Sequence, residues 1–454
     1  MGMGRKKDRE KQQDLWVAAS EMVTTPGHVF YERLNVVLNA ENFDQRVEAI
    51  CRKYYKSSSG RPSLTPGTYF RMLLLGYFEG IDSERGIAWR AADSLSYRKF
   101  LGYDLNEQTP DHTTVSRTRR LYSVETHNAV MKWVLKILRK HGLADGQSVC
   151  IDATTLQANA SMKSLVRRDT GLGYDEYLRQ LAQAEGIENP TKEQRLRLDR
   201  KRKKKTSNED WTNPNDPSAR ITKMKDGRTK LAYKAEHAVD LASGALLAVT
   251  VQPADRGDTK SYTETLDAAQ REANQSHSDG MEEVVMDKGY HSGAVMVDLA
   301  KREIRSYVPE PKRGKRRWAG QAEQQRCVYA NRRRVRADRS KRLQKLRGEL
   351  GERSFAHCYE TGAMRRLYVR GTDNVLKRAL VQAAAFNIGL LLRKLSGWGK
   401  PRQAQGRSSC IQALGFAIFA VHDVYTAVSG SLRLLGSQLL PEIGAPPRWR
   451  VVLP

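Results

Sequence analysis

The pattern of apolar and polar residues divides the chain near residue 146. Upstream of that point, apolar residues recur with helical spacing from about Val36, and the run 69–78 (YFRMLLLGYF) is too apolar for a surface helix. Thr65 and Pro66 precede this run as a cap residue and a first-turn residue, which is typical of a helix start. The sequence therefore predicts an all-α segment with the run 69–78 in its core.

Downstream of residue 146, the pattern alternates between short strands and helices. Strand-like apolar runs stand at 149–152, 231–239, 245–251, 284–287 and 306–308. The second and third runs bracket Ser243 and Gly244, so we expect them to form a hairpin. Helical patterns stand at 262–274, 292–302, 332–355 and 375–395. This order of elements predicts a mixed α/β domain.

These patterns predict four regions along the chain. They are a flexible basic lead-in (1–35), a helical N-terminal domain (36–145), an α/β domain (146–395) with a helical basic insert at about 160–222, and a C-terminal tail without an assigned role (396–454). The longest apolar run, 413–421, has about half of the ~20 residues that a membrane span needs. The five cysteines lack disulfide-like or zinc-like spacing, and the N-terminus lacks an apolar leader. We therefore expect a soluble protein of a reducing compartment, with no membrane partner.

The net charge points to a polyanionic partner. The chain has 78 Lys and Arg against 51 Asp and Glu, a formal net charge of +27. Residues 192–205 hold 9 basic and 2 acidic residues, a net of +7, and residues 311–347 hold 15 basic and 2 acidic residues, a net of +13. One basic run alone is often only a solvated helix face. Two runs that flank acidic strand ends favour nucleic acid, with an anionic membrane surface as the second candidate.

Four carboxylates stand out by their positions. Asp152 and Asp287 each end a strand-like run, and ligands bind at such strand ends in open α/β sheets. Glu349 and Glu352 are three residues apart, so they share one helix face. Each residue also has a purely structural interpretation, as a turn former or as half of an ion pair. Three such carboxylates together could hold two divalent ions ~3.5–4 Å apart, an arrangement that suits phosphodiester chemistry.

Several motifs stand in the same order as in one known family. They are Ile151–Thr154, Tyr233–Ala235, Val239–Asp240, Met286–Ser292, Gly351–His357 and Thr361–Arg366, preceded by Phe100–Gly102 and Thr109–Arg117. With these motifs the chain resembles the bacterial insertion-sequence DDE transposases, which have a ribonuclease-H-like catalytic domain behind a helical N-terminal domain. The likeness covers roughly residues 40–395.

The resemblance implies the fold, the activity and the partners. The expected fold is a ribonuclease-H-like mixed sheet with flanking helices, the catalytic domain (146–395), preceded by an all-α N-terminal DNA-binding domain (36–145). Asp152, Asp287 and Glu352 would be the catalytic residues and would hold two divalent ions, Mg²⁺ or Mn²⁺. The expected activity is hydrolysis at transposon ends and strand transfer of the 3′-hydroxyl into target DNA. A homodimer would act on double-stranded DNA in the bacterial cytoplasm, in association with the nucleoid.

Two alternative functions stay open on the same residues. One is a structure-directed DNA nuclease on the same fold, which cuts without joining. The other is a catalytically inactive DNA-binding protein derived from a transposase.

The glutamate segment departs from the pattern of many relatives, in which a Tyr precedes and a Lys follows the Glu at fixed spacing. Here Tyr359, seven residues past Glu352, replaces the lysine. Arg347 stands five residues before Glu352, one residue off the usual spacing. Glu349 therefore stays a rival for the third metal ligand.

Other residues are candidates for supporting roles. The candidate contacts to DNA phosphates are Arg353, Arg365, Lys288 and Arg117. The candidates for auxiliary groups behind the metal ligands are Asp240, Asp258 and His291, although a surface position fits His291 better. His237 is expected to be an ordinary strand residue.

Overall fold

The computed structural model describes residues 26–55, 63–201, 207–224, 226–312, 314 and 316–404. Parts of several predicted regions therefore lie outside the described residues. They are the lead-in up to residue 25, positions 56–62 of the N-terminal domain, positions 202–206 at the end of the first basic run, positions 313 and 315 of the second basic run, and the tail beyond residue 404, including the apolar run 413–421. The described residues up to Gln403 form one compact unit.

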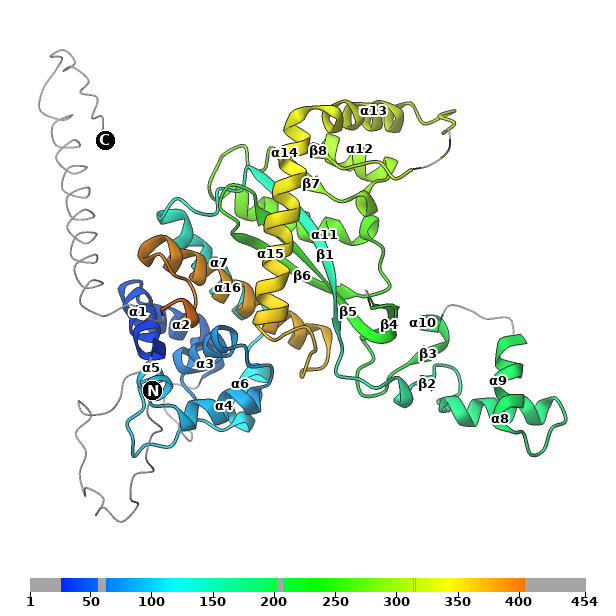
Figure 1. Ribbon diagram of the computed structural model, residues 1–454, viewed down its shortest axis with the longest axis horizontal. Coiled ribbons are helices and arrows are strands. Elements are labelled where there is room, and N and C mark those ends of the chain that lie inside the picture. The colour runs from blue at the N-terminus through cyan, green and yellow to red at the C-terminus, as the bar shows by residue number, and fades with distance from the viewer. Residues whose placement is uncertain are drawn as a thin grey trace, which may run out of the picture. The chain divides into compact units, whose positions relative to one another are not determined.

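The first third of the described chain is helical, as the sequence predicts (Figure 1). Its helices are α1 (Pro26–Ala40), α2 (Phe43–Cys51), α3 (Pro66–Glu79), α4 (Glu84–Asp93), α5 (Leu95–Leu101), α6 (His112–Leu121) and α7 (Val124–Lys140). The predicted start of α3 is confirmed, because the Thr65 side chain accepts a hydrogen bond from the Thr68 amide at 3.3 Å. The run 69–78 is buried throughout, so the predicted core is confirmed as well.

Helix α1 corrects the expected extent of the flexible lead-in. The helix begins at Pro26, so the last ten residues of the predicted lead-in are helical. Phe30, Leu34 and Leu38 recur every four residues and are buried, with at most 2% of each exposed. This apolar stripe holds α1 against the other helices, in the way that an amphipathic helix gains most of its stability.

A mixed six-stranded sheet forms the second part of the chain. Its strands are β1 (Ser148–Gln157), β4 (Arg220–Lys223), β5 (Thr229–Asp240), β6 (Leu246–Pro253), β7 (Glu283–Met286) and β8 (Arg305–Tyr307). The order is β4-β5-β1-β7-β8, and β6 also pairs with β5. Strand β5 runs antiparallel to β1 and β6, whereas β7 and β8 run parallel to β1. This is a ribonuclease-H-like sheet, and the predicted fold class is confirmed.

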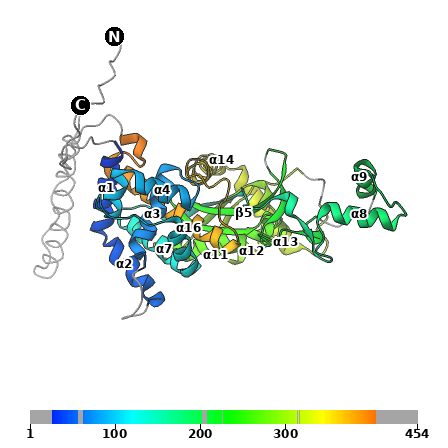
Figure 2. The ribbon, with the colours of Figure 1, turned by 90° about the horizontal axis from the view of Figure 1, so that it is seen from below.

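Helices cover both faces of this sheet (Figure 2). One face is covered by α11 (Asp258–Ala273), whose Ser261 and Thr265 donate to the Glu236 carboxylate on β5. The other face is covered by a helix with four consecutive parts. These are α14 (Asp338–Leu346), the π-helical η5 (Arg347–Gly351), α15 (Glu352–Phe355) and the π-helical η6 (Ala356–Thr361). We call this helix the glutamate helix, because it carries Glu349 and Glu352.

The structure divides the predicted helix 332–355 in two. Helix α13 (Ala322–Arg336) ends at Ala337, whose ψ of 154° is extended, and the glutamate helix begins at Asp338. Helix α12 (Gly293–Lys301) packs against α13. The break allows α13 to pack beside α12 and β8 while the glutamate helix crosses the sheet (Figure 1).

Helix α16 (Thr372–Ser396) joins the helical part of the chain to the sheet. It packs against α7 and α3 on one side and against β6 on the other. The Asn387 side chain accepts from the Leu246 amide and donates to the Leu246 carbonyl, both at 2.9 Å. The helix is long and apolar enough to span a membrane, but 89% of its most apolar window is buried in the protein, as in a core helix.

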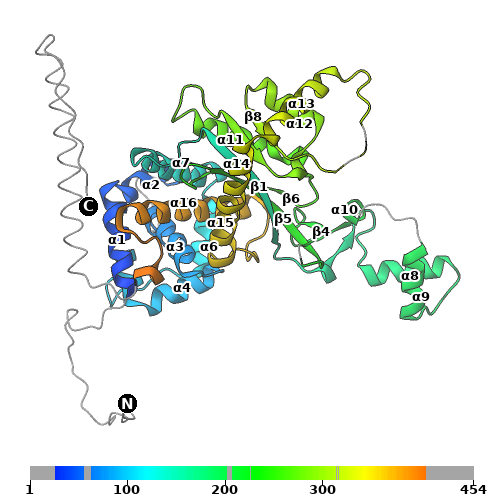
Figure 3. The ribbon, with the colours of Figure 1, turned by 45° about the horizontal axis from the view of Figure 1, so that its top comes forward.

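The segment between β1 and β4 contains short elements that extend away from the sheet (Figure 3). They are β2 (Val166–Arg167), α8 (Tyr174–Ala184), α9 (Lys192–Lys201), α10 (Ser207–Asp210) and β3 (Trp211–Thr212). Strands β2 and β3 pair with each other at its base. The basic residues of the first run, as far as they are described, lie on α9.

We predict that Asn387→Ala lowers the free energy of unfolding by about 1–3 kcal/mol, because two buried backbone groups of Leu246 lose their partner. Asn374→Ala is the matched control, since the Asn374 side chain donates only to the exposed start of the same helix, at the Arg370 carbonyl. Its cost should stay within about 0.5 kcal/mol. Urea denaturation of both variants measures the difference, and equal costs would contradict the role given to Asn387.

Candidate active site

Asp152 lies within β1 and not at its end. The sequence predicts a short strand that stops at this residue, but β1 continues to Gln157 because residues 153–157 pair with 232–236 of β5. Asp152 lies opposite His237 in the antiparallel register, so both side chains point to the face that the glutamate helix covers. About 20% of the Asp152 side chain is exposed. The carboxylate is thus positioned by a central strand, under the helix that carries Glu352.

Asp287 follows the last residue of β7, as predicted. The parallel register pairs Ile151 with Met286, so Asp152 and Asp287 are the next residues on two neighbouring strands. The Asp287 side chain also accepts a hydrogen bond from the Gly289 amide at 2.6 Å, which caps a short 3-10 turn. Asp287 therefore both caps this turn and lies next to Asp152 of the neighbouring strand.

Gly289 brings a third aspartate into this region. A Cβ atom added to Gly289 would lie 2.9 Å from Asp287 Oδ1 and 2.5 Å from Asp258 Oδ2. The two carboxylates therefore face each other across the glycine, and no side chain fits at this position. Asp258 is ion-paired with Lys234, at 2.5 Å. This pairing is the structural role of Asp258.

The glutamate helix is fastened to β1 by an arginine. Arg347 Nη1 lies 2.8 Å from Asp152 Oδ2, and Arg347 Nε donates to Gln344 Oε1 at 3.0 Å. Gly351 lies directly above β1, because a Cβ added to it would lie 4.0 Å from Asp152 Oδ2. Glu352, the next residue, is exposed. The third predicted carboxylate therefore stands on a helix held at Asp152.

The unusual spacing of Arg347 has a structural explanation. The segment Arg347–Gly351 is π-helical, and a π-helical turn closes between residues i and i+5 where an α-helical turn closes between i and i+4. Arg347 therefore lies one turn before Glu352 although five residues separate them. The extra residue is absorbed within the turn.

Glu349, the rival third ligand, is paired on the helix surface. Its Oε1 lies 2.5 Å from Arg353 Nη2, and 54% of the Glu349 side chain is exposed. Arg353, predicted as a DNA contact, is thus engaged in an i,i+4 ion pair. This pairing favours Glu352 over Glu349 as the third carboxylate.

The donor chemistry suits a hard divalent ion, but the carboxylates are not gathered around one point. Asp152, Asp287 and Glu352 offer only oxygen atoms, which Mg²⁺ and Mn²⁺ prefer. In the part of the chain that the structure describes, no three His, Cys, Asp or Glu side chains are close enough to hold a metal ion together. The Arg347 guanidinium supplies the positive charge beside Asp152.

Tyr359 stands where many relatives have a lysine, and the structure gives it another role. It is buried, and its hydroxyl lies 2.6 Å from His237 Nε2. His237 Nδ1 lies 2.8 Å from Ser354 Oγ, so His237 joins β5 to two points of the glutamate helix. Burial lowers the pKa of His237 to about 3, which keeps the ring neutral. His237 is a strand residue in the core, as predicted.

Two buried residues on the opposite face were not singled out from the sequence as site residues. Lys234 Nζ lies 3.1 Å from Glu236 Oε1, and the Glu236 carboxylate accepts from the Tyr290 hydroxyl at 3.2 Å. Burial, and next the Glu236 charge, raise the pKa of Tyr290 well above its ordinary value. The sequence signal that could have identified them is the spacing of Lys234 and Glu236, two charged residues at alternate positions of an otherwise apolar strand.

The remaining predicted residues are found in different environments. Arg365 Nη1 donates to Thr154 Oγ1 at 2.9 Å and to the Thr155 carbonyl at 3.0 Å, so this arginine fastens the chain to β1. Lys288 is exposed directly beside Asp287, and Arg117 is exposed on α6.

Two of the candidate auxiliary residues, Asp240 and His291, are buried. Asp240 shapes the β5–β6 hairpin, because its carboxylate accepts from the amides of Gly146 and Ser243 at 3.2 and 2.9 Å. The preference for a surface position at His291 is wrong, because only 1% of this residue is exposed.

We predict that the free energy of unfolding falls as the pH is lowered from 6.5 to 5. The neutral His237 of the folded protein takes up no proton there, whereas the unfolded chain does, so acid favours unfolding. The contribution of His237 is about 2 kcal/mol over this interval. Denaturant titrations at several pH values should give a shallower pH dependence for His237→Gln. An unchanged slope would contradict the burial of a neutral ring.

Comparisons with known families agree with this geometry. Residues 17–121 match the family described as Transposase domain (DUF772), and residues 144–388 match the family described as Transposase DDE domain. No curated protein and no solved structure matches the chain. The second match covers more than half of the 454 residues and includes Asp152, Asp287 and Glu352. The chain belongs to the family of DDE transposases.

Proposed function

We propose that this protein is a DNA transposase that cuts phosphodiester bonds at the ends of its element and joins the freed 3′-hydroxyl to target DNA. Membership of the DDE transposase family supports a transposase function in general. The observation that carries the specific proposal is the placement of Asp152 and Asp287 on adjacent strands, with the helix of Glu352 held at Asp152. The protein would act as a homodimer in the bacterial cytoplasm, on nucleoid DNA.

Asp152, Asp287 and Glu352 would together hold two divalent ions, Mg²⁺ or Mn²⁺. Such ions, when bound, supply Lewis acidity to the scissile phosphate and to the attacking and leaving oxygens. Gathering the three carboxylates requires Arg347 to release Asp152, and the long arginine side chain can do so by a change of rotamer. The released guanidinium then stands one helical turn from Glu352, where it can contact a DNA phosphate.

Two of the candidate DNA contacts are exposed cations. Lys288 follows Asp287 in the short turn that Asp287 caps, and Arg117 lies on α6. Each can neutralise a phosphate of the bound DNA, which supplies affinity without sequence preference.

We predict that Asp152→Asn and Asp287→Asn each lower Mg²⁺-dependent nicking of the DNA that flanks the coding region on the order of 10³-fold. Several kcal/mol of transition-state stabilisation depend on the carboxylates. Binding to the same DNA should remain within about threefold of the parent protein, because the variants keep the basic surfaces. Nicking at the parent rate by either variant would refute the assignment. A strand-transfer assay with pre-cut ends distinguishes a transposase from a nuclease that only cuts.

A matched pair of variants decides the third carboxylate. We predict that Glu352→Gln lowers nicking on the order of 10³-fold. Glu349→Gln breaks only a surface ion pair with Arg353, so nicking should change by less than about fivefold. The same flanking DNA serves for both assays. The reverse ranking would assign the role to Glu349.

A further inference from the structure

A polar groove lies beyond the end of β1, on the same strand as Asp152. The chain that follows the glutamate helix forms one wall of it. The Gln157 amide donates to the Arg365 carbonyl at 3.0 Å, and the Leu367 amide donates to the Gln157 carbonyl at 2.9 Å. Arg370 Nε donates to the Asn159 carbonyl at 3.0 Å. The wall is therefore fixed to the strand that carries the first catalytic aspartate.

The cavity of this groove next to β1 is lined by cations and hydrogen-bond donors. It has a volume of about 460 Å³ and receives three cationic side chains, those of Lys230, Arg366 and Arg370. Further polar lining residues are Asn159, Ser161, Ser164 and Asn215. Among the described residues, none of those that line this cavity is Asp or Glu. Lys230 Nζ lies 4.0 Å from Asp226 Oδ2, whereas no ion pair among the described residues engages Arg366 or Arg370. These two arginines, beside amides and hydroxyls, form a site for an anion that accepts hydrogen bonds.

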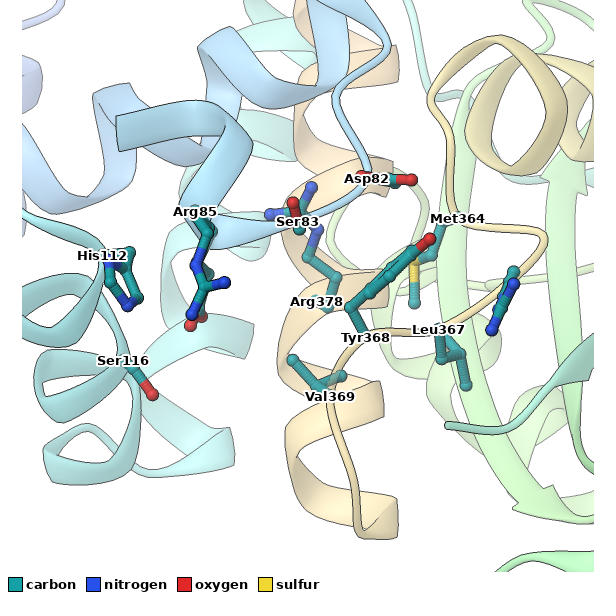
Figure 4. Close-up of a pocket in the computed structure, with 12 residues that line it drawn as sticks. Asp82, Ser83, Arg85, His112, Ser116, Met364, Leu367, Tyr368, Val369 and Arg378 are labelled. Carbon is teal, nitrogen blue, oxygen red and sulfur yellow. The ribbon is translucent and has the colours of Figure 1, made fainter. Parts of the chain in front are cut away.

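A second cavity lies beside the first and is lined in part by the N-terminal helices. Its volume is about 360 Å³, and it shares Arg366 with the first cavity. In Figure 4, Arg85 and His112 from the helical part lie on one side, and Tyr368 lies on the other. Two acids line this cavity: Glu84, which is paired with Arg119 at 2.6 Å, and Asp82, which is exposed.

The shape of the groove favours a polymer over a small anion. Two cavities that share Arg366 lie next to each other, and together they are lined from both family-matched regions, residues 17–121 and 144–388. Tyr368, of which 45% is exposed, lies beside them, and the Arg366 guanidinium lies 5.7 Å from the centre of its ring. A chain of regularly spaced phosphates can occupy two such cavities along its length.

We propose that this groove holds the sugar–phosphate backbone of the DNA end whose cleavage is proposed above. The proposal rests on the proposed function. Five residues of β1 separate Asp152 from Gln157, which is ~17 Å at ~3.3 Å per residue. This length equals about five base pairs at ~3.4 Å each. The groove therefore contacts the backbone about five base pairs from the bond that is cut.

The first test measures the salt dependence of binding to a duplex of arbitrary sequence. Each phosphate contact adds about 0.9 to the magnitude of the slope of log K against log salt concentration. We predict that Arg366→Gln/Arg370→Gln lowers that magnitude by about 1–2 and weakens binding about tenfold at moderate salt. Arg366→Lys/Arg370→Lys retains the charges and should retain the slope. Thermal unfolding and circular dichroism verify that the variants fold.

The matched control is Arg271→Gln/Lys260→Gln, which removes the same charge from α11, a helix that lines neither cavity of the groove. It should leave the slope at the parent value. If the control lowers the slope as much as the groove variant, the loss is one of general charge and the groove proposal fails. A parent-like slope in the groove variant overturns the proposal as well.

The second test locates the contact on flanking DNA. A neutral methylphosphonate placed about five base pairs from the mapped nick should weaken binding by the parent protein but not by the groove variant. Equal weakening of both proteins would place the groove elsewhere on the DNA and overturn the proposal. Failure of the proposed function has a different signature, since the parent protein would then bind DNA with the steep slope but would not nick the flanking DNA with Mg²⁺.

Discussion

The ion pair between Arg347 and Asp152 is the interaction on which the arrangement of the candidate site in this structure depends. It joins residues 195 positions apart, one on the glutamate helix and one on the central strand. Gln344 adds a second contact, because its side-chain amide donates to the Tyr307 carbonyl at the end of β8. The helical turn that holds Gln344 and Arg347 therefore contacts both β1 and β8. These strands lie on either side of β7, which Asp287 follows. Removing one partner of such a half-buried pair would leave a charge without compensation.

The opposite face of the sheet supports the same edge with buried charges. Lys234 and Glu236 lie almost entirely out of solvent and compensate each other, as buried ions must. The Glu236 carboxylate also accepts from the Tyr290 hydroxyl, three residues past Asp287. Hydrogen bonds on the face that α11 covers thus hold the turn after Asp287. On the face that the glutamate helix covers, Arg347 holds Asp152.

The sequence was informative where local chemistry decides the structure, and less so where tertiary contacts do. The cap at Thr65 and the core run 69–78 follow from local pattern, and both are as predicted. The continuation of β1 past Asp152 depends on pairing with β5, a strand some eighty residues away, which no local signal reveals. The pairing of Glu349 with Arg353 could have been inferred from their i,i+4 spacing.

The π-helical turn at Arg347–Gly351 affects how such proteins are recognised. A one-residue insertion in a helix normally rotates everything after it by about a quarter of a turn, which would carry Glu352 away from the strand. Here the wider turn contains the extra residue within Arg347–Gly351, so the residues after it keep the orientation that they would have without the insertion. A search for relatives that requires a fixed interval between the arginine and the glutamate would pass over this chain. Motif definitions that allow one extra residue at this point would retain it.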